Sequence, residues 1–214
     1  MVLKIGHRGA MGYEPENTLL SFKKALELNV DMIELDVHVC KTGEVVVIHD
    51  DKVDRTTDGK GYVAKKTFQK IRTLDAGKGQ KIPMLQEVLD IVDRKARINI
   101  ELKGKGTAKP VFGIIEKYVK EKGWSYDDFL VSSFNHHELQ KFYQLNPKVR
   151  LGILIARPTT RFARFAKKIN AYSVNVSIDL INKDFISGVH KKGLKVFVWT
   201  VNDFKDMEKM KSLE

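Results

Sequence analysis

The stretch DMIELDVHVCKTGEVVVI, residues 31–48, contains two predicted β-strands, at 31–39 and 45–48, and the short link between them. Lys41-Thr42-Gly43-Glu44 is too short to hold a crossover helix, so the two strands are predicted to form an antiparallel hairpin. The first strand alternates between apolar and polar residues, as expected of a strand whose two faces meet different surroundings. Its apolar face carries Ile33, Leu35, Val37 and Val39, and its polar face carries Glu34, Asp36 and His38.

Apolar runs and helical periods alternate along most of the remaining chain. Alternation of strands and helices predicts parallel strands whose apolar faces are covered by helices. The predicted fold is therefore an α/β barrel of the TIM type, with seven strands that could run parallel. The 214 residues are few for a complete barrel, which usually needs about 250. The further predicted strands are 2–6, 97–102, 129–133, 150–155, 172–176 and 195–201.

A single catalytic domain is predicted to span residues 1–214, because neither repeats nor a linker interrupts the alternation. Segment 50–83 is the exception, since it is rich in Thr, Lys, Asp and Gly and separates the hairpin from the next predicted helix at 85–95. We expect this segment to form a small insertion over one end of the barrel and not a second domain.

The composition is that of an ordinary globular domain, with 43% hydrophobic and 30% charged residues. No apolar run is long enough for a signal peptide or a membrane span, so stable membrane insertion is not expected. The single cysteine, Cys40, indicates a reducing compartment, and the cytoplasm is the predicted location. The net charge of +11 is compatible with nucleic-acid binding. The lysines are spread along the chain without interleaved aromatic residues, however, so no nucleic-acid partner is expected.

Carboxylates on two predicted strands indicate a metal site. Strand 97–102 repeats the alternation of the first hairpin strand and carries Glu101 on its polar side. In a barrel the outward side packs on helices, so Glu34, Asp36 and Glu101 are expected to point inward together. Three such carboxylates repel one another unless a cation is bound, and their oxygens suit one magnesium or calcium ion. The alternative is a solvated polar face on an exposed edge strand.

Two histidines are predicted to lie near these carboxylates. A tight turn centred on Thr42-Gly43 would pair Asp36 with His49, and a histidine there suits general acid–base work. A lone histidine in a strand is more often structural, so this inference depends on the register of the hairpin. The first strand ends in His7-Arg8-Gly9, at the carboxyl end where barrel active sites lie. An arginine fork beside a histidine suits a phosphate anion.

A series of short motifs runs through the chain. They are His7-Arg8-Gly9, Pro15-Glu16-Asn17-Thr18 with Phe22, Ile33-Glu34-Leu35-Asp36-Val37, Val47-Ile48-His49-Asp50, Arg55-Thr56-Thr57 with Gly59 and Gly61, Leu74-Asp75-Ala76-Gly77, Ile82-Pro83-Met84-Leu85-Gln86-Glu87-Val88-Leu89, Ile100-Glu101-Leu102-Lys103, Ser132-Ser133-Phe134 and Val198-Trp199-Thr200-Val201-Asn202. In order and spacing they resemble the motifs of the glycerophosphodiester phosphodiesterase family. The resemblance covers nearly all 214 residues. It implies a metal-dependent barrel enzyme that cleaves a glycerophosphodiester into an alcohol and sn-glycerol 3-phosphate.

The same resemblance implies a role for each matching position. The implied roles are general acid–base catalysis for His7 and His49, metal ligation for Glu34, Asp36 and Glu101, phosphate binding for Arg8 and Lys103, and a glycerol or alcohol pocket for Phe134 and Trp199. For the two aromatic residues the alternative is plain core packing. Residues 16–18 are expected to cap the first helix and not to contact substrate.

The resemblance has one gap. The family normally continues, after the helix that here ends at Glu214, into a last strand of the Gly-Ile-Ile-Thr-Asp type, and the sequence lacks it. We therefore expect the natural chain to extend past Glu214, and the barrel as given to lack its last strand. The expected partner is a small-molecule glycerophosphodiester. Three alternatives stay open: a phospholipase D-type or C-type enzyme acting on lysophospholipids, a non-catalytic phosphate-binding protein, and a nucleic-acid binder.

Overall fold

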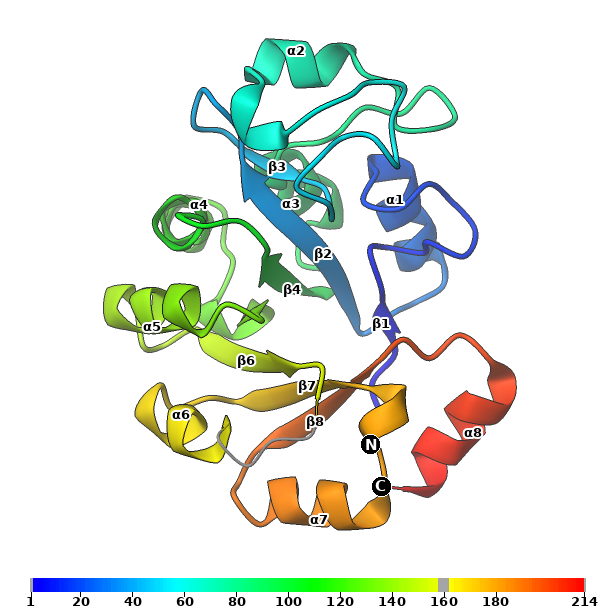
Figure 1. The fold of residues 1–214 in the computed structure, drawn as a ribbon, viewed down its shortest axis with the longest axis vertical. Coiled ribbons are helices and arrows are strands. Elements are labelled where there is room, and N and C mark those ends of the chain that lie inside the picture. The colour runs from blue at the N-terminus through cyan, green and yellow to red at the C-terminus, as the bar shows by residue number, and fades with distance from the viewer. Residues whose placement is uncertain (1, 158–161, 214) are drawn as a thin grey trace.

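The structure is a computed structural model that describes residues 2–157 and 162–213 (Figure 1). Its strands are β1 (Ile5–Gly6), β2 (Met32–Val39), β3 (Val45–Val47), β4 (Arg97–Leu102), β5 (Phe129–Ser133), β6 (Arg150–Ile155), β7 (Ser173–Ser177) and β8 (Lys195–Trp199). Its α-helices are α1 (Leu19–Glu27), α2 (Phe68–Thr73), α3 (Leu85–Val92), α4 (Ala108–Glu121), α5 (His136–Leu145), α6 (Phe162–Lys168), α7 (Lys183–His190) and α8 (Phe204–Ser212). Short 3₁₀ helices lie at Val63–Lys65, Tyr126–Asp128 and Ile178–Leu180.

One curled sheet forms the centre of the molecule. Its strands follow the order β1-β2-β4-β5-β6-β7-β8, and each neighbouring pair along this path is parallel. Helices surround the sheet, as Figure 1 shows. The prediction of an α/β fold of the TIM-barrel type with seven parallel strands is therefore confirmed. Among the described residues no backbone pairing joins β1 to β8, so the curled sheet stays open between these two edges.

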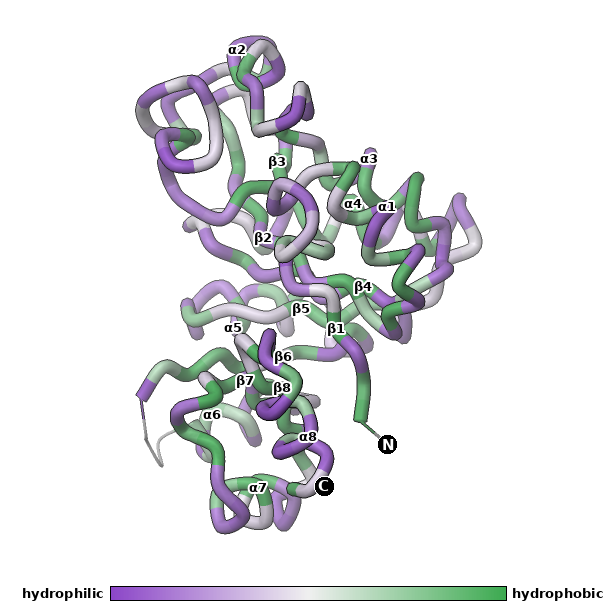
Figure 2. Tube along the Cα trace, turned by 90° about the vertical axis from the view of Figure 1, so that its right-hand side faces the viewer, coloured by the Kyte–Doolittle hydropathy of each residue, from purple (hydrophilic) through white to green (hydrophobic). Residues whose placement is uncertain are grey.

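Side chains alternate between the two faces of each strand, and the face that carries the apolar side chains packs on the helices. On β2, Ile33, Leu35 and Val37 are buried in the main hydrophobic cluster, together with apolar residues of β4 to β7 and of the helices. Figure 2 shows hydrophobic residues concentrated along the strands. The last elements are less covered, since β8 is only half-buried and α8 has no buried residue. Within the described ranges, no helix has both the length and the apolar character needed to cross a membrane.

The segment between β3 and α3 forms a cap beside the barrel, at the top of Figure 1. It contains α2 and has a small hydrophobic cluster of its own, separate from the main one. The cluster consists of Cys40, Val46, Ile48, Val53, Val63, Ile71, Leu74, Ala76 and Ile82. Residues 50–83, which the sequence predicts to be an insertion, make up most of this segment, and below we call residues 50–83 the insertion. The cluster includes Val46 of β3 and Cys40, which directly follows β2, so the insertion packs on the hairpin.

The predicted register of the hairpin is wrong by one residue. β2 and β3 are antiparallel as expected, but His38 pairs with Val46 and Val37 with Val47. Ile48 N donates to Asp36 O at 3.0 Å, so Asp36 is aligned with Ile48 and not with His49. The reason is the turn, in which Cys40 N donates to Glu44 O at 3.0 Å and encloses a three-residue loop. Gly43 adopts φ 101° in this loop, as three-residue hairpin loops require near their end.

Candidate active site

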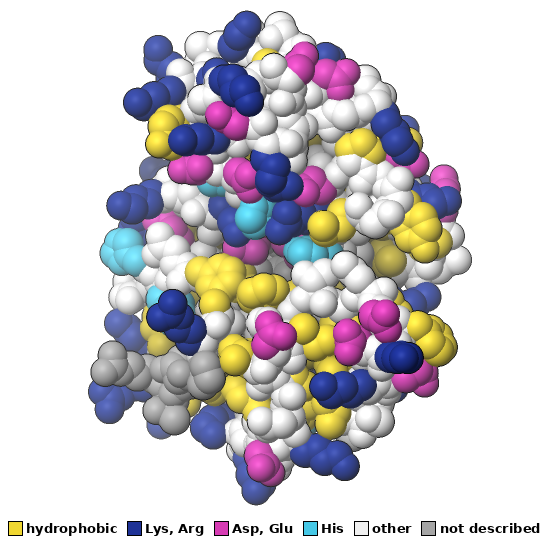
Figure 3. Space-filling view, turned by 45° about the vertical axis from the view of Figure 1, so that its right-hand side comes forward, with side chains coloured by type: hydrophobic (Ala, Val, Ile, Leu, Met, Phe, Trp, Pro, Cys, Tyr) yellow, Lys and Arg dark blue, Asp and Glu magenta, His cyan; other side chains and the backbone are white. Residues whose placement is uncertain are grey.

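Most of the predicted site residues lie toward the carboxyl ends of β1, β2 and β4. Glu34 and Asp36 belong to β2, and Glu101 belongs to β4, where it pairs in register with Asp36. His7 follows β1 directly, and Lys103 follows β4. Figure 3 shows histidine, acidic and basic side chains together on this face of the molecule.

Three buried carboxylates form the centre of the site. One oxygen each from Glu34, Asp36 and Glu101 can be chosen so that all lie within 4.8 Å of one another. The Glu34 carboxylate accepts a hydrogen bond from the Arg8 backbone N–H at 2.9 Å. Asp36 accepts one from Asn17 Nδ2, also at 2.9 Å. These bonds hold the Glu34 and Asp36 carboxylates in place.

The charges of this cluster favour a bound cation. Burial raises the pKa of Glu34 well above its usual value, and the charges of Asp36 and Glu101 raise it further. Burial and Asp36 likewise raise the pKa of Glu101 to about 7, although Lys103 opposes the rise. Lys103 Nζ lies 2.9 Å from Glu101 Oε1, and Arg8 Nε lies 3.5 Å from Asp36 Oδ2. Two cations thus face three carboxylates, and an all-oxygen donor set fits magnesium or calcium.

His7 lies on the β1 side of the carboxylates. Its Nε2 atom is 3.9 Å from Glu34 Oε2, and its Nδ1 atom is 3.2 Å from Thr200 Oγ1. Burial, and after it the charge of Arg8, lowers the pKa of His7 to about 4. The ring is therefore neutral near neutral pH and can accept a proton.

His49 lies on the opposite side, beyond the end of β3. Its Nδ1 atom is 2.6 Å from Asp50 Oδ1, and its Nε2 atom is 3.1 Å from Lys103 Nζ. Its backbone carbonyl lies 3.1 Å from His38 Nε2. His49 thus reaches the cluster through Lys103, and not through the cross-strand pairing with Asp36 that the sequence predicted.

Phe134 and Trp199 form an aromatic wall next to Lys103. Their ring centroids are 5.8 Å apart with an interplanar angle of 84°. Lys103 Nζ lies 5.8 Å from the centroid of the Phe134 ring. Phe134 is 41% exposed and belongs to neither hydrophobic cluster, so core packing does not explain it. Phe134 and Trp199 complete the site. Every predicted site residue now has at least one other predicted site residue within 5.8 Å, measured between the contacting atoms or ring centroids.

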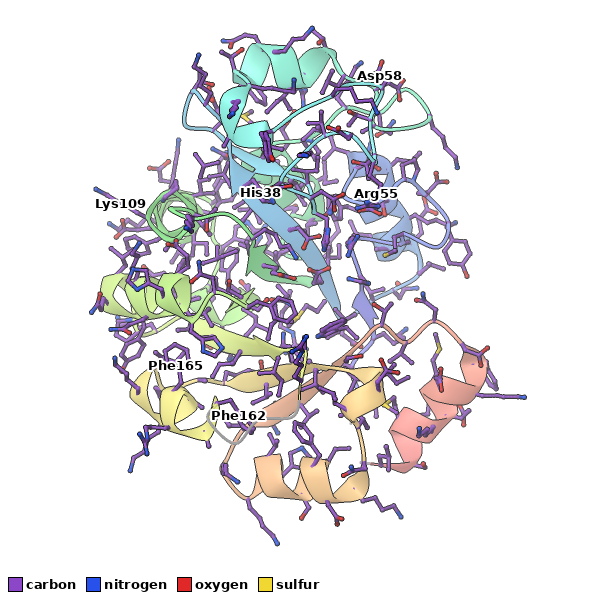
Figure 4. The ribbon with its side chains drawn as sticks, viewed as in Figure 1. His38, Arg55, Asp58, Lys109, Phe162 and Phe165 are labelled. Atoms are coloured by element: carbon purple, nitrogen blue, oxygen red, sulfur yellow. The ribbon has the colours of Figure 1, made fainter. Side chains whose placement is uncertain are left out.

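Sequence reasoning missed several residues that the structure brings into the site. Thr18 does cap α1, since its side chain accepts from Ser21 N, but its neighbours do not act as caps. Asn17 binds Asp36, and Glu16 Oε1 accepts from Arg8 Nη1 at 2.9 Å. Arg55 of the insertion, labelled in Figure 4 together with His38, binds both Glu16 and Asp50. Glu16, Asn17, Asp50 and Arg55 all belong to the motifs that resemble the family, and no other feature of the sequence indicated that they lie in the site.

The model of the glycerophosphoryl diester phosphodiesterase family matches residues 7–214. The chain belongs to this family. A glycerophosphodiester phosphodiesterase of Caldanaerobacter subterraneus is 39% identical over 218 residues, which cover 97% of this chain and 89% of the relative. One of Bacillus altitudinis is 37% identical over 221 residues, with 97% and 89% covered. The predicted family and enzyme class, a phosphoric diester hydrolase, are confirmed.

A solved structure supports the same assignment of this phosphodiesterase. An Oleispira antarctica phosphodiesterase in complex with the product sn-glycerol-3-phosphate superposes with a TM-score of 0.91 at 27% identity. The superposition covers 100% of this chain and 90% of the other. The curled sheet with its outer helices is therefore the fold of the family.

Proposed function

We propose that this phosphodiesterase hydrolyses glycerophosphodiesters to an alcohol and sn-glycerol 3-phosphate. The observation that carries the proposal is the buried triad Glu34, Asp36 and Glu101 with a histidine on either side. The Oleispira antarctica relative, which holds sn-glycerol-3-phosphate, supports this choice of product. The substrate is a small molecule with an anionic phosphodiester group, and the proposed reaction breaks one P–O ester bond with water.

Glu34, Asp36 and Glu101 would hold one divalent ion, magnesium or calcium. When bound, such an ion offsets the negative charge that builds up on the phosphoryl oxygens during hydrolysis. The raised pKa values of Glu34 and Glu101 support this assignment, because they show how costly it is to ionise all three carboxylates without a further positive charge.

The remaining charged residues would act on the phosphate and on the protons. Arg8 and Lys103 would bind the non-bridging oxygens, since both already lie beside the carboxylates. One of His7 and His49 takes the proton of the attacking hydroxyl, and the other gives a proton to the leaving alkoxide. The attacking hydroxyl is either water or the 2-hydroxyl of the glycerol, in which case water opens the resulting cyclic phosphate.

Phe134 and Trp199 would line the pocket for the glycerol or the alcohol. The exposed position of Phe134 beside Lys103, and the contact of its ring with half-buried Trp199, support this role, because a substrate phosphate bound at Lys103 brings its neighbouring carbons to this wall. The cytoplasm stays the predicted location, on the basis of the single cysteine Cys40.

A substrate panel tests the proposal. We would incubate the protein with glycerophosphocholine, glycerophosphoethanolamine or lysophosphatidylcholine, with magnesium, with calcium or with chelator, and identify the products. We expect sn-glycerol 3-phosphate from the first two substrates when metal is present. Turnover of lysophosphatidylcholine alone would favour the phospholipase D-type alternative, and binding of all three without turnover would favour a phosphate-binding protein.

A further inference from the structure

Three charged side chains, Asp50, Arg55 and Glu16, join His49 to Arg8. Asp50 Oδ1 lies 2.6 Å from His49 Nδ1. The Arg55 guanidinium donates to both Asp50 oxygens, from Nε at 2.8 Å and from Nη2 at 3.0 Å. It also donates from Nη1 and Nη2 to the two oxygens of Glu16, each at 2.8 Å. The same Glu16 accepts from Arg8 Nη1 at 2.9 Å. A continuous chain of ionic hydrogen bonds therefore runs from one predicted site residue to another.

The geometry of Arg55 makes this chain more than a surface ion pair. The Arg55 side chain is 48% exposed, and a single contact at such a site contributes little. Here both carboxylates receive two hydrogen bonds from one planar group, which restricts its orientation. Arg55 holds the pKa of Asp50 below its usual range. Burial would raise the pKa of Glu16, but Arg55 and Arg8 outweigh burial and lower it. Both carboxylates are thus ionised near neutral pH.

The partners of His49 decide which of its ring nitrogens carries the proton. An ionised carboxylate only accepts hydrogen bonds, so Nδ1–H must donate to Asp50. The Lys103 ammonium only donates, so Nε2 presents a lone pair toward Lys103 and the site. The contact between His38 and the His49 carbonyl holds the backbone at the same position.

We propose that Asp50 is a positioning residue that holds His49 in the Nδ1–H tautomer, and that Arg55 and Glu16 hold Asp50 in place. The proposal rests on the proposed function, because the proton that His49 transfers at Nε2 belongs to that reaction. It also gives the insertion a part in catalysis. Asp50 and Arg55 lie in the insertion, whereas Glu16 lies in the loop between β1 and α1.

The first test measures the tautomer directly and needs no substrate. Nitrogen-15 NMR of the magnesium-loaded protein, recorded at increasing pH until the His49 signals stop changing, distinguishes Nδ1–H from Nε2–H in the neutral ring. We expect His49 to be Nδ1–H in wild type. Asp50→Asn keeps the shape of the side chain but removes its charge, so the Nε2–H population should rise. A wild-type His49 protonated on Nε2, or a tautomer that Asp50→Asn leaves unchanged, would overturn the proposal.

The second test is kinetic. Loss of the carboxylate partner of a catalytic histidine lowers kcat by up to about 10⁴, so Asp50→Asn should lower kcat for glycerophosphocholine by about 10²–10⁴. KM should change by less than about threefold, because Asp50 acts on proton transfer and not on binding. Arg55→Lys keeps the positive charge but loses the planar group that donates two hydrogen bonds to each carboxylate, and it should lower kcat by about tenfold. The matched control is Lys78→Gln, because Lys78 also joins the insertion to the β1–α1 loop, through Glu14 at 2.6 Å, without leading to His49. Its kcat should equal that of wild type.

A double-mutant cycle separates positioning from a general structural effect. If Asp50 acts through His49, Asp50→Asn should change the residual kcat of the His49→Ala variant by less than about threefold. An equal loss of kcat in both backgrounds would show that Asp50 does not act through His49. A His49→Ala variant with wild-type kcat would remove His49 from the proposed mechanism, and a wild-type protein that hydrolyses no glycerophosphodiester would overturn the proposed function itself, whereas an unchanged tautomer overturns only the role of Asp50.

Discussion

At the scale of single residues, the two histidines differ in their surroundings, since His7 lies beside Glu34 whereas His49 reaches the carboxylates through Lys103. His7 is half-buried, and burial together with the charge of Arg8 lowers its pKa, which keeps its ring neutral. His49 lies between a carboxylate and an ammonium, Asp50 and Lys103. Neither ring belongs to a hydrophobic cluster. Their substitution should therefore affect chemistry far more than folding.

His7→Ala and His49→Ala should each lower kcat by about 10²–10⁴, the usual contribution of a general acid or base. The far-ultraviolet circular dichroism and the urea midpoint should stay close to those of wild type, because no core contact is lost. Turnover assays of both variants check the expectation. A variant that retains full turnover would remove that histidine from the proposed mechanism.

Glu101 should make the stability of the metal-free protein depend on pH. Its folded-state pKa of about 7 lies above the usual value for a glutamate. Because the folded-state pKa is raised, the contribution of Glu101 to stability is fully present below about pH 4.5 and is lost as the pH rises through about 7. Glu101→Gln cannot ionise at this position. In chelator, the free energy of unfolding of wild type minus that of Glu101→Gln should therefore fall between about pH 5 and pH 8. Urea titrations at several pH values measure this difference, and a constant or rising difference would contradict the expectation.

At the scale of elements, the sequence predicts the strands and their inward faces well, because a period of two distinguishes the two sides of a strand. Glu34, Asp36 and Glu101 share a face for this reason, and their closeness follows from the parallel pairing of β2 with β4. The hairpin register failed because it depends on whether the turn contains two or three residues. The contacts of Glu16 and Asn17 were not predicted, because both residues lie in a loop, and the path of a loop is harder to predict from sequence than that of a strand. Asn17 adopts φ 56° in that loop, a conformation that side-chain pattern alone does not indicate.

Replacing glycine by alanine should change the stability of the protein in opposite directions at Gly43, in the hairpin turn, and at Gly113, in α4. Gly43 has φ 101°, and a Cβ there meets no atom within 4 Å, so Gly43→Ala suffers only from backbone strain. We expect it to destabilise the protein by about 1 kcal/mol. Gly113 lies inside α4, and a Cβ added there also meets no atom within 4 Å, so Gly113→Ala should stabilise by about 0.5–1 kcal/mol. Urea unfolding of both variants measures the two changes. Equal effects would mean that the positive φ at Gly43 is not required.

At the scale of the whole molecule, the site joins the two ends of the open sheet. His7 follows β1 and Thr200 follows β8, and their side chains meet at 3.2 Å across 193 positions of sequence. The two edge strands share no backbone pairing among the described residues, so this contact lies where the sheet comes together. The site therefore depends on the correct curvature of the entire sheet, and binding to the site should stabilise the entire fold.

The central claim is that Glu34, Asp36 and Glu101 form a metal site that the hydrolysis requires. The measurement that tests it most directly is the release of sn-glycerol 3-phosphate from glycerophosphocholine, followed together with the melting temperature during metal titration of chelator-treated protein. We expect activity to vanish in chelator and to return with magnesium or calcium. The melting temperature of wild type should rise with metal by mass action, and that of Glu101→Gln should rise much less. Full activity in chelator, with no metal-dependent shift in either protein, would contradict the account.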